Sequence, residues 1–122
     1  MDFIEKIRDE EGYLPLYDPD SLDGIEVIIF KYGGGYDWTA FLAFARNGQF
    51  YWASGGGCSC NSFGDFIYSV ADLETGRDEE LVAAYKRWAS EEYNPALTNE
   101  ERVSAHRDIT QAIKDYKKKV KK

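Results

Sequence analysis

The two cysteines of this 122-residue chain, Cys58 and Cys60, are separated by a single serine, and they are the first candidates for chemistry. In an extended backbone, side chains two residues apart project to the same side, with their Cα atoms roughly 6.6 Å apart. That separation is near the upper limit that a disulfide spans. Three interpretations stay open: reduced thiols packed as small hydrophobic groups, two ligands of a metal ion, or a redox-active or nucleophilic thiol.

A metal site at the cysteine pair would be incomplete on its own. Structural zinc usually takes four ligands, and the only histidine, His106, lies in a distant predicted helix. Asp65 or a second chain would have to supply the missing ligands. We therefore expect no cofactor, with zinc at Cys58 and Cys60 as the alternative.

Glycine runs and aromatic residues accompany the cysteine pair. The runs Gly33–Gly35 and Gly55–Gly57 lack the Gly-Lys-Ser/Thr ending of a phosphate-binding loop, so we interpret them as flexible connections between strands. If both lie at one end of a sheet, the aromatic side chains beside them line one concavity suited to a small ligand. The predicted ligand-binding set is Tyr36, Trp38, Trp52, Gly57, Cys58, Cys60, Asn61 and Asp65. No catalytic residue is predicted.

Three strands are expected ahead of the cysteines. Residues 24–32 are rich in β-branched side chains and apolar on nearly both faces, which is typical of a buried central strand. Residues 37–46 form a second strand with two alternating faces. The predicted members of one face are Trp38, Ala40, Leu42 and Phe44, and those of the other are Thr39, Phe41, Ala43 and Ala45. Asn47-Gly48 predicts a type I′ hairpin turn into a third strand at residues 49–54.

Two helices are expected in the second half of the chain. Residues 78–93 carry apolar side chains at helical spacing and acidic residues in the first turn, and Asn94-Pro95 ends this helix. Residues 98–101, Thr-Asn-Glu-Glu, form a capping box for a helix that runs to the end of the chain. Its apolar seam is Val103, His106, Ile109, Ile113, Tyr116 and Val120. The seam is spaced as in a coiled coil, so a homodimer through this helix is a further hypothesis.

Together the elements predict an α+β fold, an antiparallel sheet of three to four strands with two C-terminal helices packed on one face. Residues 1–122 are expected to form one domain. Its parts are an irregular segment at 1–23, a β-meander with the Cys-Ser-Cys loop at 24–66, and helices at 76–122 that end in a basic tail at 114–122. No apolar run approaches about 20 residues, and no signal peptide is recognised, so we expect no contact with a membrane.

The charge is divided unevenly along the chain. Residues 1–100 contain 7 Lys and Arg against 19 Asp and Glu, a net charge of −12, whereas residues 101–122 contain 8 against 3, a net charge of +5. Nucleic-acid binding depends on neutralising phosphates with Lys and Arg, so we expect no nucleic-acid partner. The acidic body favours a basic protein partner.

The stretch Gly57-Cys58-Ser59-Cys60, with its Asn-Gly hairpin before it and Ser69-Val70-Ala71-Asp72 after it, resembles a family of small proteins encoded mainly by tailed phages of actinobacteria. The resemblance covers roughly residues 36–74. Members carry a Gly-Cys-Ser-Cys box that commonly continues as Ser-Pro-Phe-Glu. Here Ser62 is followed by Phe63-Gly64-Asp65, so the proline is missing and the acid is an aspartate. The resemblance implies a phage origin, and with it the host cytoplasm, but no activity.

These observations favour binding over catalysis, and no catalytic motif indicates an enzyme. Our leading hypothesis is a phage accessory protein that inhibits a host or defence protein through an acidic, aromatic surface. The alternative is a binder of a small molecule or metal at the Cys-Ser-Cys loop and its neighbouring aromatic residues.

Overall fold

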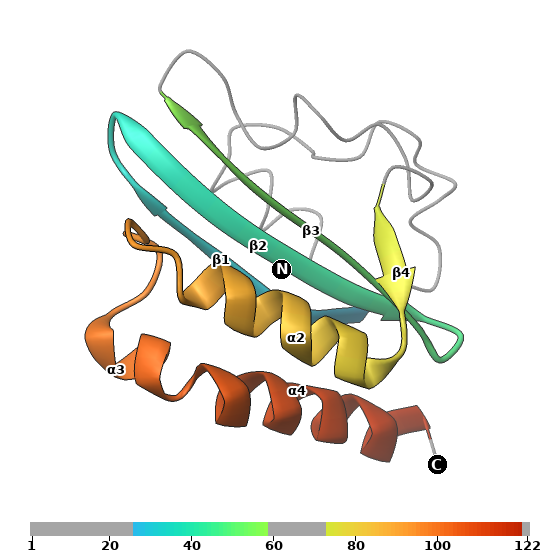
Figure 1. The fold of residues 1–122 in the computed structure, drawn as a ribbon. Coiled ribbons are helices and arrows are strands. Elements are labelled where there is room, and N and C mark those ends of the chain that lie inside the picture. The colour runs from blue at the N-terminus through green and yellow to red at the C-terminus, as the bar shows by residue number, and fades with distance from the viewer. Residues whose placement is uncertain (1–25, 59–72, 121–122) are drawn as a thin grey trace.

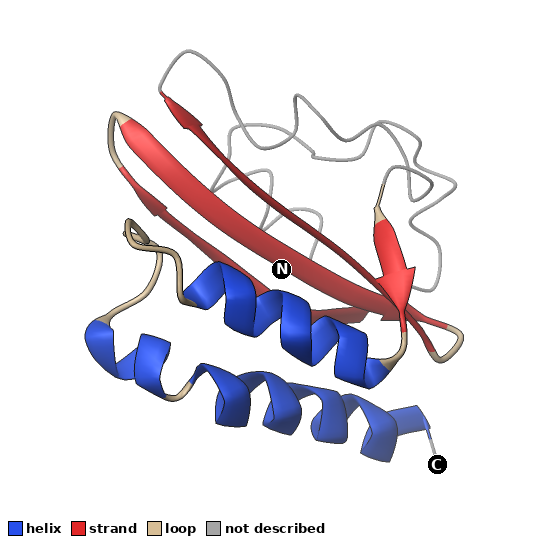
Figure 2. Cartoon of the chain, viewed as in Figure 1, coloured by secondary structure: helices blue, strands red, loops and turns tan. Residues whose placement is uncertain are grey.

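The computed structural model describes residues 26–58 and 73–120, which form a four-stranded antiparallel sheet with helices on one face (Figures 1 and 2). The strands lie in chain order in the sheet: β1 (Glu26–Gly34), β2 (Asp37–Arg46), β3 (Gln49–Cys58) and β4 (Glu74–Gly76). The helices are α2 (Asp78–Ala89), α3 (Asn99–Val103) and α4 (Ala105–Val120). The predicted α+β fold is confirmed. The predicted segment 1–23 lies outside the described residues.

The centre of the sheet is β2, whose two faces are both buried. Phe41 on the helix-covered face and Leu42 on the opposite face each expose 1% of their surface, and the predicted alternation of the two faces is confirmed. The prediction that residues 24–32 form a central strand is wrong, because β1 pairs with β2 alone among the described strands. Half-burial under the helices accounts for its apolar character.

The Asn47-Gly48 turn joins β2 to β3 as predicted. Both residues have positive φ, +54° and +80°, which is the requirement of a type I′ turn. The backbone N–H of Gly48 donates to the hydroxyl of Tyr116 at 3.0 Å, so a hydrogen bond connects the last turns of α4 to this hairpin.

Strand β3 is longer than predicted. It continues past Ser54 through Gly55–Gly57 to Cys58, paired with β2 along its whole length. The glycine run is therefore part of a strand and not a flexible connection. Glycine has a low strand propensity, but the neighbouring backbone of β2 supplies the hydrogen bonds that hold it extended. A short fourth strand, β4, pairs with Phe50–Trp52 of β3.

Helix α2 packs on the sheet through Leu81, Tyr85, Trp88 and Ala89, the members of its buried face. Tyr85 and Trp88 contact Phe41 of β2 with ring centroids 5.1 and 5.5 Å away. The helix ends at Ala89, earlier than the predicted residue 93, because the side chain of Asn94 folds back and donates to the carbonyl of Trp88.

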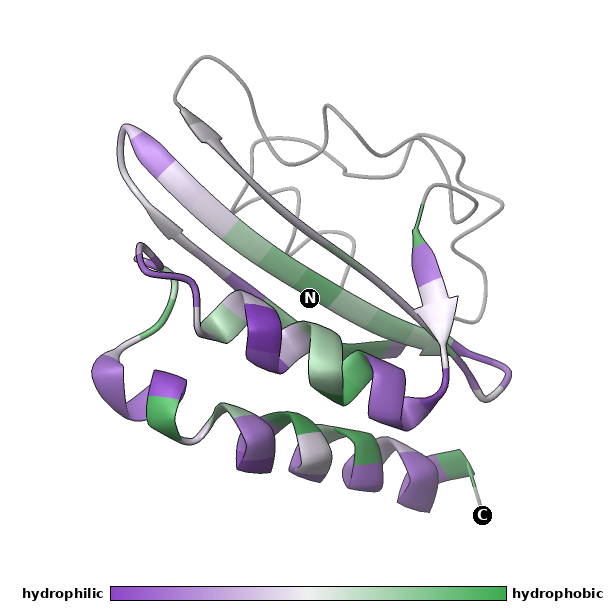
Figure 3. Ribbon diagram, in the orientation of Figure 1, coloured by the Kyte–Doolittle hydropathy of each residue, from purple (hydrophilic) through white to green (hydrophobic). Residues whose placement is uncertain are grey.

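The predicted helix after Thr98 is divided into α3 and α4 by Ser104. The capping box is confirmed, with the Thr98 hydroxyl accepting from the N–H of Glu101 at 3.1 Å. At the division, the Ser104 hydroxyl donates to the Asp108 carboxylate at 2.7 Å. Figure 3 shows the middle of β2 as hydrophobic and the outer side of α4 as largely hydrophilic.

The buried face of α4 consists of Ala105, Ile109, Ile113 and Tyr116. The predicted seam is therefore wrong at three positions: Val103 is 90% exposed, Val120 is 54% exposed, and His106 is also exposed. Because Ser104 interrupts the helix, Val103 no longer lies on the same face as the buried residues of α4. Ala105, one turn before Ile109, occupies the buried position that had been predicted for His106. Because the central seam positions pack within the chain, a homodimer would have to use other side chains.

No helix in the described ranges has the length and apolar character needed to cross a membrane.

Candidate functional site

Three tyrosine side chains mark the end of the sheet where β1 turns into β2. Tyr32, Tyr36 and Tyr93 expose 37%, 73% and 61% of their surfaces, more than any other aromatic residue in the described part of the chain. Three acidic residues accompany them. We call this region the tyrosine end and define it as Tyr32, Tyr36, Asp37, Glu91, Glu92 and Tyr93.

The hairpin that carries Tyr36 is tight because Gly34 adopts a conformation that few other residues tolerate. Its φ is +121°, and a Cβ at this position would lie 2.2 Å from the carbonyl oxygen of Asp37. Only Gly35 and Tyr36 then link β1 to β2, which leaves the Tyr36 ring in solvent.

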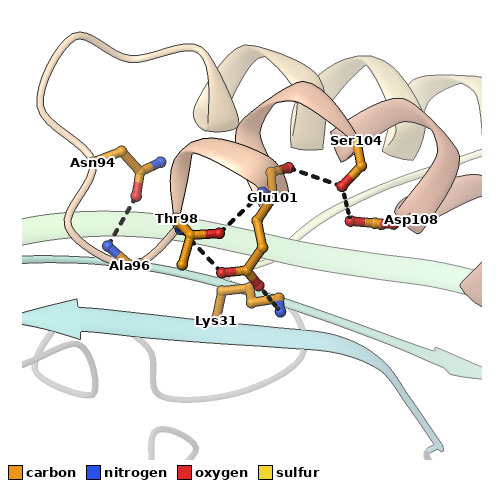
Figure 4. A network of polar contacts seen from close by, with 7 residues as sticks. All are labelled: Lys31, Asn94, Ala96, Thr98, Glu101, Ser104 and Asp108. Carbon is orange, nitrogen blue, oxygen red and sulfur yellow. Dashed lines mark hydrogen bonds and ion pairs between the residues drawn. The ribbon is translucent and has the colours of Figure 1, made fainter.

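Tyr93 reaches the same end of the molecule through the loop after α2. The side chain of Asn94 shapes this loop, because its Oδ1 accepts from the N–H of Ala96 at 3.2 Å while its Nδ2 donates to the last turn of α2 (Figure 4). The loop packs directly on β1: a Cβ on Gly33 would lie 2.6 Å from the carbonyl oxygen of Pro95. A backbone contact two residues after Tyr93 therefore holds the loop against the hairpin strand.

The two glycine runs flank the same part of β2. Gly33 and Gly56 lie opposite Thr39 on its two sides, and Gly34 and Gly57 lie opposite Trp38. The hypothesis that both runs meet at one end of the sheet is confirmed in position, although most of their residues belong to strands.

The two tryptophans of the predicted ligand-binding set lie on opposite faces of the sheet. Trp38 is buried on the face away from the helices, where its ring lies 5.9 Å from that of Tyr32. Trp52 is buried on the helix-covered face, and its indole N–H donates to Glu74 at 2.8 Å. The structure therefore does not bring them around one concavity. The two-residue turn sets a register in which Trp52 pairs with Ala43. Ala43 is five residues from Trp38, so the two lie on opposite faces of β2, and the opposite placement of the two tryptophans already follows from the predicted hairpin.

Cys58 is the last residue of β3 and lies opposite Asp37 in the sheet, so its backbone belongs to the tyrosine end. Gly57, its neighbour, is paired with Trp38. The remaining predicted members, Cys60, Asn61 and Asp65, lie outside the described residues. Within residues 26–58 and 73–120, no cluster of three His, Cys, Asp or Glu side chains could hold a metal ion. The three interpretations of the cysteine pair remain predictions.

A polar network fixes α3 to β1 beside the tyrosine end (Figure 4). Lys31 donates to Glu101 Oε2 at 2.7 Å, and Glu101 Oε1 accepts from the N–H of Thr98 at 3.0 Å. Both contacts favour the charged carboxylate, with the Lys31 hydrogen bond as the larger cause, so the pKa of Glu101 is lowered. This ion pair therefore anchors α3 to β1.

The carboxylates of the tyrosine end itself are not neutralised in this way. Asp37, Glu91 and Glu92 are exposed and form no ion pair with another described residue. The nearby guanidinium of Arg102 donates instead to the backbone carbonyls of Ala89 and Glu91. This end therefore presents negative charge to solvent.

The opposite end of the sheet carries a run of lysines. Three consecutive lysines, Lys117–Lys119, occupy the last turn of α4, where Lys117 pairs with Asp78 and Lys119 lies 3.7 Å from Glu26. The ten residues of β2 separate the two ends by roughly 30 Å. The lysines therefore lie at the end of the sheet away from the tyrosines, together with the carboxylates of the first turn of α2.

The shifted pKa values do not indicate acid–base catalysis. The hydrogen bond with Glu79, followed by the one from Lys117, lowers the pKa of Asp78 to about 2, which keeps it charged at neutral pH. Burial, with smaller effects of Asp108 and Glu101, raises the pKa of Tyr85, which keeps it neutral. Neither group changes its protonation near pH 7, the range in which a general acid or base works best.

The sequence analysis included Tyr36 in the site but missed the other five members of the tyrosine end: Tyr32, Asp37, Glu91, Glu92 and Tyr93. The sequence analysis put Tyr93 at the end of the helix at residues 78–93 and predicted no contacts for its side chain. A possible signal was Tyr93-Asn94-Pro95 itself, since an aromatic residue just before a helix-breaking pair stands in a surface loop.

Searches of protein-family models, curated proteins and solved structures found no match to this chain.

Proposed function

We propose that this protein acts by binding another protein through the tyrosine end. The observation that carries the proposal is the gathering of all three exposed aromatic side chains of the described residues at one end of the sheet. Tyrosine supplies a large apolar ring and a polar hydroxyl, and it is enriched at protein interfaces for that reason. Single exposed tyrosines would need no explanation, whereas three at one end of the sheet, on a tight hairpin and on the loop packed against it, favour a contact surface.

The charge of this end specifies the kind of partner. Asp37, Glu91 and Glu92 accompany the tyrosines and form no ion pair with another described residue, and they outnumber the one nearby guanidinium, that of Arg102. Such a surface attracts and orients a basic protein surface and repels nucleic acid. The partner is therefore a protein with a patch of Lys and Arg.

The resemblance of the Gly-Cys-Ser-Cys box to phage proteins supports a biological setting for this binding. In an infected cell the partner would be a host or defence protein, and the phage protein would inhibit it by covering a basic surface that the partner needs. The hairpin suits this role because only Gly35 and Tyr36 link its two strands, so few residues are ordered when it docks.

The proposal is tested by charge reversal and truncation at the tyrosine end. Asp37→Lys and Tyr36→Ala variants would be compared with Asp115→Lys, which makes the same charge change on an exposed position of α4. A protein captured from host lysate by the wild-type chain would be purified, and its affinity for each variant measured by calorimetry. We expect Asp37→Lys and Tyr36→Ala to weaken binding by about tenfold or more, and Asp115→Lys to leave it nearly unchanged. Equal affinities for all variants would refute the assignment of the tyrosine end.

A further inference from the structure

A groove of about 410 Å³ opens between α2 and α4, and none of its lining residues belongs to the tyrosine end. The lining consists of Asp78, Glu79, Val82, His106, Thr110, Ile113, Lys114 and Lys117. Its volume lies within the range of small-molecule sites. The two helices pack side by side on the sheet and run in opposite directions (Figure 1), so residues from the start of α2 face residues from the end of α4.

The floor of the groove is apolar. Val82 of α2 is half-buried and Ile113 of α4 is buried, and both belong to the core or pack against it. These two side chains give a ligand a surface from which water can be displaced, which is favourable in proportion to the apolar area covered.

Thr110 supplies an unexplained polar atom beside this floor. Its Oγ1 is buried and has no hydrogen-bond partner among the described residues. A buried hydroxyl without a partner is destabilising, and few such groups occur in native structures. Threonine in a helix is divided between two χ1 rotamers, so one rotamer change can exchange its methyl and hydroxyl groups and offer the hydroxyl to a ligand in the groove.

The walls of the groove carry opposite charges. Asp78 and Glu79 come from the first turn of α2, whereas Lys114 and Lys117 come from α4. The ion pair between Asp78 and Lys117 closes one end. Glu79 contacts Asp78 beside it, and neither Glu79 nor Lys114 forms an ion pair with a described residue, so one acidic and one basic side chain remain on facing walls.

We propose that this groove binds a small zwitterion with an apolar body, of the class of the apolar α-amino acids. The ligand's apolar side chain lies on Val82 and Ile113. Its carboxylate contacts Lys114 and the hydroxyl of Thr110, which are neighbours one helical turn apart. Its ammonium group faces Glu79. A zwitterion satisfies both walls at once, whereas a simple anion or cation would leave one of them unmatched.

The test uses the full-length ¹⁵N-labelled protein titrated with L-leucine and followed by amide chemical shifts. Two analogues separate the charges: N-acetyl-L-leucine lacks the ammonium group, and L-leucinamide lacks the carboxylate. We expect saturable shifts at residues 79, 82, 110, 113 and 114 with a Kd of about 1 mM, and binding of each analogue at least about tenfold weaker.

Two matched lysine variants locate the site. Lys114→Met should weaken L-leucine binding about tenfold, whereas Lys118→Met, on an exposed position of the next turn, should leave it unchanged. Thr110→Val should weaken binding without unfolding the protein, since valine preserves the shape of threonine. The absence of saturable shifts would overturn the proposal. Analogue binding equal to that of L-leucine, or equal effects of the two lysine variants, would also overturn it.

Discussion

Replacing Thr39 by valine tests two buried hydrogen bonds that join β2 to β3 and to α2. The Thr39 hydroxyl accepts from the indole N–H of Trp88 at 2.9 Å and donates to the carbonyl of Gly55 at 3.1 Å. It therefore joins β2 to the glycine run of β3 and to the last turn of α2. Thr39 and Trp88 expose only 5% and 3% of their surfaces, so water cannot replace a lost partner.

The expected magnitude follows from what valine leaves behind. Valine fills the same space but offers neither an acceptor nor a donor, so the buried indole N–H loses its partner and the Gly55 carbonyl loses one of its own. An unsatisfied buried polar group costs about 1–3 kcal/mol. We expect Thr39→Val to lower the free energy of unfolding by about 2–3 kcal/mol. Thr39→Ser is the control, because it keeps both hydrogen bonds and loses one methyl group, at about 1 kcal/mol.

The assay is guanidinium unfolding followed by circular dichroism, which does not depend on the fluorescence of Trp88. A double-mutant cycle with Trp88→Phe isolates the hydrogen bond: the double variant should be more stable than the sum of the single losses predicts, by about 1 kcal/mol. An unchanged m-value would show that the variants alter stability and not the extent of unfolding. The reasoning is refuted if Thr39→Val is no more destabilising than Thr39→Ser, or if the cycle shows no coupling.

Two further predictions concern the frame of the molecule. Gly33→Ala should destabilise the fold by about 1–3 kcal/mol in the same unfolding assay, because the new methyl group would lie 2.6 Å from the Pro95 carbonyl oxygen and 2.7 Å from the Ala96 Cα. Gly35→Ala is the control, since a methyl group there would have nothing within 4 Å. Equal losses of stability in the two variants would contradict the packing described. The lowered pKa of Asp78, about 2 against 3.8, means that its charged form stabilises the folded state above pH 4, and that this contribution is lost as the pH falls from about 4 to 2. Because the Asp78 side chain is 39% exposed, the loss of unfolding free energy should stay below about 1 kcal/mol. Asp78→Asn should remove this part of the pH dependence of unfolding. If the stability of that variant changed with acid pH as the wild type does, the role given to Asp78 would be contradicted.

Local patterns were sufficient where the signal and the structure involve the same few residues. The alternation of residues 37–46 correctly predicted both faces of β2, because side chains of any strand alternate. Asn47-Gly48 correctly predicted the turn, since both residues tolerate positive φ. The capping box at Thr98 and Glu101 was also correct, because its two hydrogen bonds close within one helical turn.

Contacts between distant segments decided the rest. The run Gly55–Gly57 carries no strand signal, yet it is a strand because β2 pairs with it along its whole length. Tyr93 belongs to the candidate site because Gly33, 60 residues earlier, leaves room for the loop of Pro95 and Ala96. His106 is exposed because the division of the helix at Ser104 determines which face of α4 packs on the sheet, and that face begins at Ala105.

By itself, then, the sequence determined the two faces of β2, the Asn47-Gly48 turn, the helix start at Thr98 and the uneven charge of this protein, since each depends on neighbours along the chain. Only the tertiary structure decided that Tyr93 lies at the same end as Tyr32 and Tyr36, and that β1 lies at the edge of the described sheet. Those relations depend on strand register and helix packing, which join residues that no local pattern connects.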